Sequence, residues 1–458
     1  MIAVTSPNVC DDADNKRPDE SQQSRRLNII PREEHGIDPH QVCKHATTVI
    51  NTLQEAGFAA YLVGGGVRDL LLGRLPKDFD VATSAHPEQV KSLFSRSRLI
   101  GRRFRLVHVC FGRYVIEVAT FRGNGGSDEH PDRHIEDGHL IRDNVFGSEE
   151  EDALRRDFTI NALMYDPRTE TVRDYVGGYG DLRQGILRMI GDPETRYRED
   201  PVRMIRAVRF ISSRGLTLER ETEKPIQQLA SLLAKVAPAR LFEEVCKVFL
   251  SGHGSKALPL MAEYGLFQEL FPATRLEYRD GDWHAGKVLT QALINTDQRV
   301  KQDKPVTPGF LMAAMLWQPL QEQIEMLEQE GLQGMDAVAE AIDVVFEEQI
   351  KRVAIPRRFT SIAREIWLMQ PRFRRMRGKR VLRLLAERRF RAAYDFLLLR
   401  ALEIPELEPI ARWWTEIQEV PRQQQEQQAM ANATASRGPR RRRRRRGGQR
   451  GKAAEGKE

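Results

Sequence analysis

The sequence has few cysteines, and those it has are far apart. Its 458 residues include four, with no paired spacing between them. A disulfide framework or a cysteine-based zinc site needs cysteines at short, repeated spacings. The sequence therefore argues against both, and it predicts buried or incidental thiols for Cys10, Cys43, Cys110 and Cys246.

Long apolar runs are also missing. No stretch approaches the roughly 18 apolar residues that a membrane-spanning helix needs. The N-terminus, MIAVTSPNVCDDADNKRP, lacks the basic start and long apolar segment of a secretory signal. We therefore expect no membrane span and a cytoplasmic location.

Excess charge of one sign is confined to the C-terminus. The net charge is +7, but eleven Lys or Arg and two Glu from Arg437 onward give that stretch +9 and leave −2 for residues 1–436. The run RRRRRRR stands among Gly and Pro and cannot form a core, so residues 417–458 are predicted to be a disordered linker and basic tail. The tail is either solvated without a partner or bound to RNA, which the release of phosphate counterions favours. RNA-decay or RNA-chaperone proteins are further candidate partners.

The most informative segment is YLVGGGVRDLLLGRLPKDFDVAT, residues 61–83, which begins with a glycine-rich turn. Gly64, Gly65 and Gly66 let the backbone approach a phosphate closely, and the short helix they open has unpaired amides at its start. Gly73 is predicted to end this helix. The turn therefore predicts a site for a triphosphate.

Two carboxylates follow on the predicted strand DFDVAT. Asp78 and Asp80 are one residue apart, and because side chains alternate along a strand, both point to the same side. Adjacent anions are costly unless cations hold them. Mg²⁺ prefers one or two protein carboxylates and completes its shell with water and phosphates, so the pair predicts a magnesium site.

Two further segments, RRDFTINAL at 155–163 and EDPVRMIRAVRF at 199–210, accompany the glycine turn and the Asp-x-Asp pair. Together they resemble the nucleotidyltransferases of the DNA polymerase beta superfamily. Within it, they are similar to the branch that contains bacterial tRNA nucleotidyltransferases and poly(A) polymerases. The resemblance extends over most of the chain and implies nucleotidyl transfer to an RNA 3′ end.

The predicted fold class is α+β: a polymerase-beta-like nucleotidyltransferase head with a mixed sheet and helices, followed by an all-helical neck and body. Local signals predict a helix with Asp38 as N-cap and Pro39 as its first residue, and a hairpin turn at Gly112 and Arg113. The expected parts are a disordered N-terminus at 1–27, the head at 28–185, a nucleotide-recognising neck at 186–250, an RNA-binding body at 251–416 and the tail at 417–458.

One polar stretch, residues 123–148, lacks periodicity and is predicted to be a mobile or functional loop. Its His130, His134 and His139 could suggest a metal site. No cysteine accompanies them and their neighbours are loop formers, so a solvated loop is the preferred interpretation.

A third carboxylate usually completes a two-metal site that stabilises the attacking and leaving oxygens. Glu117, in YVIEVATFR on a neighbouring strand, is one candidate on geometry, although it could instead pair with Arg122. Asp157 is the other candidate, because the resemblance places it in the active site. The sequence leaves the choice open.

The resemblance implies further nucleotide-binding roles. Asp157 would organise the site and read the ribose, Asn161 would support it one helical turn on, and Arg156 would meet the triphosphate. Arg68, in the helix after the glycine turn, would belong to the same site. Without the resemblance, a surface ion pair on a helix would be the preferred interpretation of Asp157.

The resemblance also assigns base recognition to EDPVR. Asp200 and Arg203 would present a donor and acceptor pattern to the base, and Arg206, on the same helical face, would support them or contact phosphate. Alternatively, Asp200 merely caps a helix that starts with Pro201. Arg240, in PARLFEE, matches a motif that braces this pocket, or it forms a surface ion pair.

Poly(A) polymerases and CCA-adding enzymes share all these features. LIGRRFRLVHV at 99–109 resembles a segment that marks bacterial poly(A) polymerases, and GKRVLRLLAERRFRAAYDFLLLRA at 378–401 resembles their C-terminal region. No HD-type phosphohydrolase motif is present. We therefore predict a poly(A) polymerase, which extends RNA with AMP from ATP and releases pyrophosphate.

Two alternatives stay open. CCA addition to tRNA would use CTP as well as ATP, and EDPVR serves both families. A non-catalytic RNA-binding adaptor would need no metal-binding pair, so Asp78 and Asp80 argue against it. The basis of nucleotide choice, the RNA targets, the tail length, the oligomeric state and the protein partners are not determined by the sequence.

Overall fold

The computed structural model describes residues 27–101, 105–123, 133–136, 139–143, 145–425 and 427. The basic tail, most of the predicted disordered N-terminus, His130, and part of LIGRRFRLVHV lie outside these ranges. The chain divides into two compact units. The first contains residues up to 199 together with 217–222, and the second contains 200–216 and the residues from 223 onward.

The first unit is built on an eight-stranded sheet with the strand order β1-β10-β9-β2-β3-β6-β5-β4. Every neighbouring pair is antiparallel except β3 and β6, which are parallel. The strands are β1 (Asn28–Ile30), β2 (Ala60–Val63), β3 (Asp80–Thr83), β4 (Ser97–Ile100), β5 (Leu106–Phe111), β6 (Tyr114–Thr120), β9 (Met164–Asp166) and β10 (Thr171–Asp174). The predicted mixed sheet is confirmed, as is the hairpin turn at Gly112 and Arg113.

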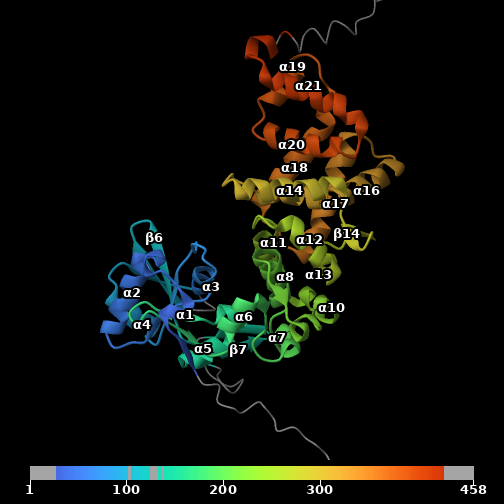
Figure 1. Cartoon of the computed structure of the whole chain (residues 1–458). Coiled ribbons are helices and arrows are strands. Elements are labelled where there is room, and N and C mark those ends of the chain that lie inside the picture. The colour runs from blue at the N-terminus through green and yellow to red at the C-terminus, as the bar shows by residue number, and fades with distance from the viewer. Residues whose placement is uncertain are drawn as a thin grey trace, which may run out of the picture. The chain divides into compact units, whose positions relative to one another are not determined.

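Helices α2 (Lys44–Glu55) and α4 (Pro87–Leu93) pack against the sheet and against each other, at the side of the unit where Figure 1 labels both. The prediction of one helix starting at Pro39 is wrong in part. Asp38 does accept the backbone N–H of His40, but only a short 3₁₀ turn, Pro39–Gln41, follows. Val42 is buried and extended, which interrupts the helix before α2 begins.

The polar stretch at 123–148 is not wholly a loop, which corrects the prediction. Strands β7 (Arg133–Glu136) and β8 (His139–Asp143) pair as an antiparallel hairpin. The sequences RHIE and HLIRD show no regular alternation of apolar and polar residues, so the sequence did not predict strands there. His134 and His139 lie on the two strands.

The segment around RRDFTINAL contains α5 (Glu149–Arg155) and the 3₁₀ helix η3 (Thr159–Asn161). Helix α6 (Gly178–Gln184) supports η3, since the Thr159 hydroxyl donates to Asp181 at 2.7 Å. A buried Asp174 accepts four backbone N–H groups at the start of α6. The segment is therefore anchored through satisfied buried polar groups.

The other short helices of this unit are α1 (Arg32–His35), α3 (Gly65–Leu71) and α7 (Pro193–Glu199), and a two-stranded sheet pairs β11 (Ile186–Leu187) with β12 (Thr217–Leu218). Helix α9 (Arg220–Glu223) crosses the boundary between the units in the sequence.

The second unit is helical, apart from one hairpin among its described residues, β13 (Glu277–Arg279) with β14 (Asp282–His284). Its helices are α8 (Val202–Arg214), α10 (Ile226–Leu229), α11 (Pro238–Phe249), α12 (Gly254–Glu263), α13 (Leu266–Leu270), α14 (Lys287–Lys301), α15 (Pro308–Met315), α16 (Trp317–Gln329), α17 (Met335–Arg352), α18 (Arg357–Met369), α19 (Lys379–Leu385), α20 (Phe390–Ala401) and α21 (Glu408–Glu419). Within the described ranges, no helix has the length and apolar character to cross a bilayer. The predicted helical body is confirmed, and α21 extends past the predicted start of the linker at residue 417.

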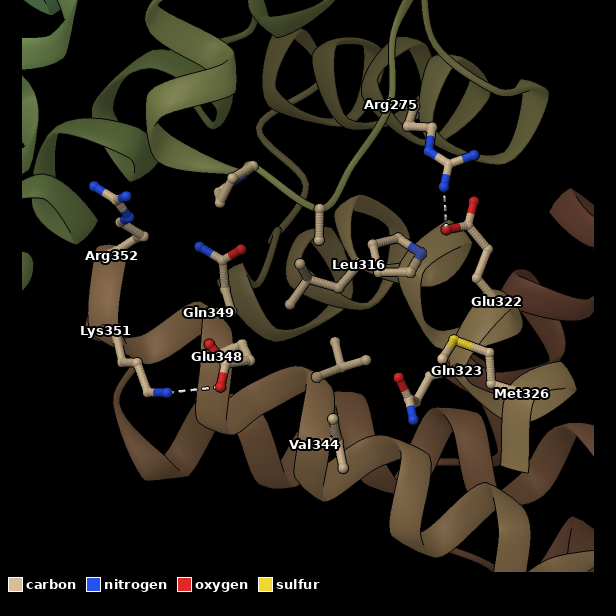
Figure 2. A pocket seen from close by; sticks show the side chains of 14 residues that line it. Arg275, Leu316, Glu322, Gln323, Met326, Val344, Glu348, Gln349, Lys351 and Arg352 are labelled. Atoms are coloured by element: carbon tan, nitrogen blue, oxygen red, sulfur yellow. Dashed lines mark hydrogen bonds and ion pairs between the residues drawn. The ribbon is translucent and has the colours of Figure 1, made fainter. Parts of the chain in front are cut away.

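The second unit contains a pocket of about 640 Å³ between α16 and α17 (Figure 2). Apolar residues such as Leu316 and Val344 line it, and the ion pair between Arg275 and Glu322, at 3.1 Å, lies at its edge. None of the predicted site residues lines this pocket.

The contact between α6 and η3 leads to the first prediction. A Cβ at Gly178 would lie 2.1 Å from the Thr159 carbonyl oxygen, whereas a Cβ at Gly180 would meet no atom within 4 Å. Gly178→Ala should therefore lower the free energy of unfolding by about 1–3 kcal/mol. The matched Gly180→Ala should leave it unchanged or raise it by about 0.5–1 kcal/mol. Urea unfolding of both variants measures the difference, and equal midpoints would contradict the close contact.

Candidate active site

The glycine turn lies at the end of β2, where the chain enters α3. Gly64 has φ +71° and ψ −132°, a conformation that strongly favours glycine. A Cβ there would lie 3.2 Å from Nη1 of Arg156, so the turn and this arginine are in close contact. A Cβ at Gly66 would contact the Asp78 carbonyl oxygen at 3.4 Å. Gly73 follows the helix with φ +67°, which confirms the predicted helix end.

The carboxylate strand is shorter than predicted. β3 begins at Asp80, so Asp78 precedes the strand. The parallel register of β3 and β6 places Asp80 beside Glu117. Loss of hydration, together with repulsion from Glu117 and Asp78, raises the pKa of Asp80 from 3.8 to about 6, and Arg156 opposes this rise. The structure therefore brings the three predicted metal ligands into one electrostatic neighbourhood with Arg156.

Glu117 already has a neighbour other than a metal ion. Its Oε1 lies 3.3 Å from Nε2 of His108 on β5, and its side chain is half-exposed. Arg122, the alternative partner in the sequence analysis, donates its backbone N–H to Asp152 at 3.2 Å. Among the residues described, no three His, Cys, Asp or Glu side chains form a set that could hold a metal ion. Asp78 and Asp80 supply the one or two carboxylates that Mg²⁺ usually takes from a protein, so these residues fit the ion with water and phosphates as further ligands.

A hydrogen-bonded chain links the two sequence motifs. Arg68 donates from Nη1 to Asn161 Oδ1 at 2.6 Å, and Asn161 donates from Nδ2 to Asp157 Oδ1 at 3.0 Å. Asp157 and Asn161 are not one turn apart on a helix, which corrects the prediction. Helix α5 ends at Arg155, and Asn161 lies on η3. The two side chains nevertheless meet as expected, because the 3₁₀ turn folds Asn161 back toward Asp157.

Arg156 is held from two sides. Its Nη2 and Nε donate to Asp152 Oδ2 at 2.8 and 3.2 Å, and its Nη1 donates to the Asn161 carbonyl oxygen at 3.2 Å. Asp152 is not among the site residues predicted from the sequence. Its spacing of four residues from Arg156 was the available signal, because such pairs meet on a helix.

The predicted base-recognition residues lie in the second unit. Asp200 Oδ1 accepts the backbone N–H of Val202 at 3.3 Å, and Oδ2 accepts a bond from Arg240 at 2.7 Å. Helix α8 starts at Val202, so Pro201 rather than Asp200 holds the cap position. Arg203 and Arg206 are half-buried and three residues apart, hence on one face.

Comparison with known protein families gives matches along most of the chain. Three family models match the chain: "Poly A polymerase head domain" at 60–188, "Probable RNA and SrmB- binding site of polymerase A" at 215–276, and "Polymerase A arginine-rich C-terminus" at 330–448.

Poly(A) polymerase I of Escherichia coli O6:H1 is 50% identical over 422 residues, which cover 90% of each chain. Poly(A) polymerase I of Haemophilus influenzae is 46% identical over 88% of this chain and 91% of its own. The CCA-adding enzyme of Lactobacillus helveticus is 41% identical, but over 49% of this chain and 54% of its own. Among solved structures, the Bacillus stearothermophilus CCA-adding enzyme in complex with CTP has a TM-score of 0.51 at 27% identity and covers 83% of both chains.

The mixed sheet, the glycine turn and the carboxylates at the start of β3 are those of a nucleotidyltransferase of the polymerase-beta type. Its fold is shared with CCA-adding enzymes, one of which has a TM-score of 0.59 at 20% identity. The chain belongs to the family of bacterial poly(A) polymerases, as identities of 46–50% over about nine tenths of its length establish.

The raised pKa of Asp80 makes the stability of the metal-free protein depend on pH. A carboxyl group whose pKa is higher in the folded state binds its proton more tightly there, so this group's contribution to stability falls as pH rises from about 4 through about 6. Asp80→Asn removes that dependence. In EDTA, the unfolding midpoint of Asp80→Asn should rise relative to that of the parent protein as the pH increases from about 4 through about 6. A difference that stays constant from pH 4 to 8 would contradict the predicted carboxylate repulsion.

Proposed function

We propose that this chain adds AMP from ATP to RNA 3′ ends without a template, with two Mg²⁺ ions at Asp78 and Asp80. As a poly(A) polymerase, the chain is a polynucleotide adenylyltransferase, and its residues determine how the transfer proceeds. The RNA 3′-oxygen attacks the α-phosphorus, the bond to the β-phosphate breaks, and pyrophosphate leaves. The observation that carries the proposal is the cluster of Asp78, Asp80 and Glu117 next to the glycine turn.

When bound, Mg²⁺ would stabilise the negative charge on the attacking and leaving oxygens. Asp78 and Asp80 would hold it. Gly64 and Gly65 would let the triphosphate approach the backbone, because glycine has no side chain of its own. Arg156 lies against Gly64, and its guanidinium would contact the phosphates with charge-assisted hydrogen bonds.

Asp157 and Glu117 are both candidates for the third carboxylate. Asp157 Oδ1 accepts bonds from Asn161 and from the backbone N–H of Phe158, and this arrangement supports a role in organising the ribose site. Arg68 supports the same group through Asn161. Glu117 is the candidate that lies beside Asp80.

Base recognition is proposed for Asp200 and Arg203, with Arg206 in support. The ion pair between Asp200 and Arg240 supports this assignment, because it orients the Asp200 carboxylate. The same ion pair supports the predicted role of Arg240 in bracing this pocket.

RNA would be bound by the helical body and by the basic tail, whose phosphate contacts would add non-specific affinity. The family description of residues 215–276 as a probable RNA-binding site supports the first. We place the enzyme in the cytoplasm, and we propose RNA-decay or RNA-chaperone proteins as partners of the tail. CCA addition is not favoured, because CCA-adding relatives match about half of this chain.

The direct test of the function offers the purified protein an unstructured RNA with each ribonucleotide separately. ATP alone should give long products. Addition of one or two residues from CTP would instead indicate CCA-type activity, and no product with any nucleotide would indicate the adaptor.

Removing a metal-binding carboxylate should abolish chemistry while leaving the fold intact. Asp78→Ala or Asp80→Ala should lower AMP incorporation by on the order of 100-fold or more, because the lost charge stabilisation acts mainly in the transition state. Asp336→Ala, at an exposed aspartate of the second unit, is the matched control and should retain full turnover. Near-normal turnover in either site variant, with the fold checked by circular dichroism, would refute the metal assignment.

Arg203→Ala should weaken the use of ATP and reduce nucleotide choice. Loss of a charge-assisted contact costs about 1.5–3 kcal/mol, which corresponds to roughly 10- to 150-fold in kcat/KM. Exposed Arg168→Ala, outside the residues proposed to bind RNA, is the control. The readout is the ratio of kcat/KM for ATP to that for CTP, and an unchanged ratio would make Arg203 a structural residue.

A further inference from the structure

Asp152 is a nearly buried acidic residue to which the proposed function assigns no role. Its side chain is 12% exposed, and that of its partner Arg156 is 24% exposed. One carboxylate oxygen, Oδ2, accepts the two bonds from Arg156 described above. The other, Oδ1, accepts the backbone N–H of Arg122. A single carboxylate therefore ties together two segments that are 34 residues apart in the sequence.

Both segments border the candidate active site. Arg122 follows the end of β6, the strand that carries Glu117. Arg156 follows the end of α5, touches the Gly64 position and stands near enough to Asp80 to oppose the rise in its pKa. Asp152 thus holds the Nε and Nη2 atoms of the guanidinium, whereas Nη1 faces the Gly64 position.

Helix α5, which carries Asp152, is itself fixed to the sheet. Glu149 at its first position accepts the hydroxyl of Tyr61 on β2 at 2.9 Å and that of Tyr175 at 2.7 Å. Arg173 on β10 donates to the same carboxylate at 2.8 Å. Because the start of α5 is held by three side chains, Asp152 has a fixed position from which to orient Arg156.

The remaining donors of Arg156 suit a phosphate. A guanidinium has five N–H groups. Two donate to Asp152 and one to the Asn161 carbonyl oxygen, so two remain, one on each Nη atom. A phosphate can accept bonds from such a pair in the bidentate geometry that arginine favours.

We propose that Asp152 is a positioning residue that fixes the Arg156 guanidinium toward the phosphates of the incoming ATP. This inference rests on the proposed function, in which Arg156 contacts the triphosphate. The competing explanation is an ordinary ion pair at a four-residue spacing that only stabilises α5. The two explanations differ in what they predict for ATP use at equal protein stability.

The test compares Asp152→Asn, Asp152→Glu and Glu150→Gln in the full-length protein at saturating RNA. Asp152→Asn keeps an oxygen acceptor but loses the charge, and should raise the KM for ATP about tenfold, with a smaller change in kcat. Asp152→Glu should recover part of this loss. Glu150→Gln neutralises an exposed acid two residues earlier in α5, on a different side of the helix, and should leave the KM unchanged.

A double-mutant cycle identifies the residue through which Asp152 acts. In an Arg156→Ala background, Asp152→Asn should have no further effect on the KM for ATP, because the group it orients is gone. An equal fold-change in both backgrounds would overturn the proposal, as would a KM for ATP of Asp152→Asn equal to that of the parent protein. If Asp152→Asn does not fold, the cycle is run with Asp152→Glu, and the same two outcomes overturn the proposal.

Failure of the proposed function has a different signature. In that case the parent protein would not incorporate AMP, or Asp80→Ala would retain activity. Normal incorporation by the parent protein with a KM insensitive to Asp152 would refute only the positioning role.

Discussion

The candidate active site depends on one exception in the sheet, the parallel pairing of β3 with β6 among antiparallel neighbours. This register places Asp80 beside Glu117, and Asp78 lies just before the same strand. Loss of hydration and the nearby like charges both disfavour ionisation, and together they raise the pKa of Asp80. The fold therefore holds together an arrangement that is unfavourable without a cation. Such an arrangement is expected where the cation and its substrate supply the missing charge.

Several buried carboxylates around this cluster are held by hydrogen bonds. Asp174 accepts four backbone N–H groups, and Asp181 accepts the hydroxyl of Thr159 beneath η3. Glu149 and Asp152 fix α5 and the arginine that follows it. Buried carboxylates without such partners would cost several kcal/mol each, so these networks also specify one arrangement of the site. Catalysis by electrostatic stabilisation requires groups that do not reorganise during the reaction.

The second unit has its own helical core, with Phe373, Leu397 and Trp414 among its buried residues. It also carries the residues proposed to recognise the base, at the start of α8. CCA-adding relatives share about half of the chain, whereas poly(A) polymerases share about nine tenths. The family model of the arginine-rich C-terminus matches residues 330–448 of this chain.

The sequence by itself determined the glycine turn, the carboxylate pair, the mixed α+β class and the family, because these depend on local patterns and short spacings. It did not determine that β3 starts at Asp80, that α5 stops at Arg155, or that polar strands form a hairpin within residues 123–148. Those boundaries depend on burial and on pairing with distant segments. Only the tertiary structure showed that the Asp152 carboxylate accepts hydrogen bonds from both Arg122 and Arg156. A residue's place in a network of this kind depends on which strands pair, and a single sequence does not record that pairing.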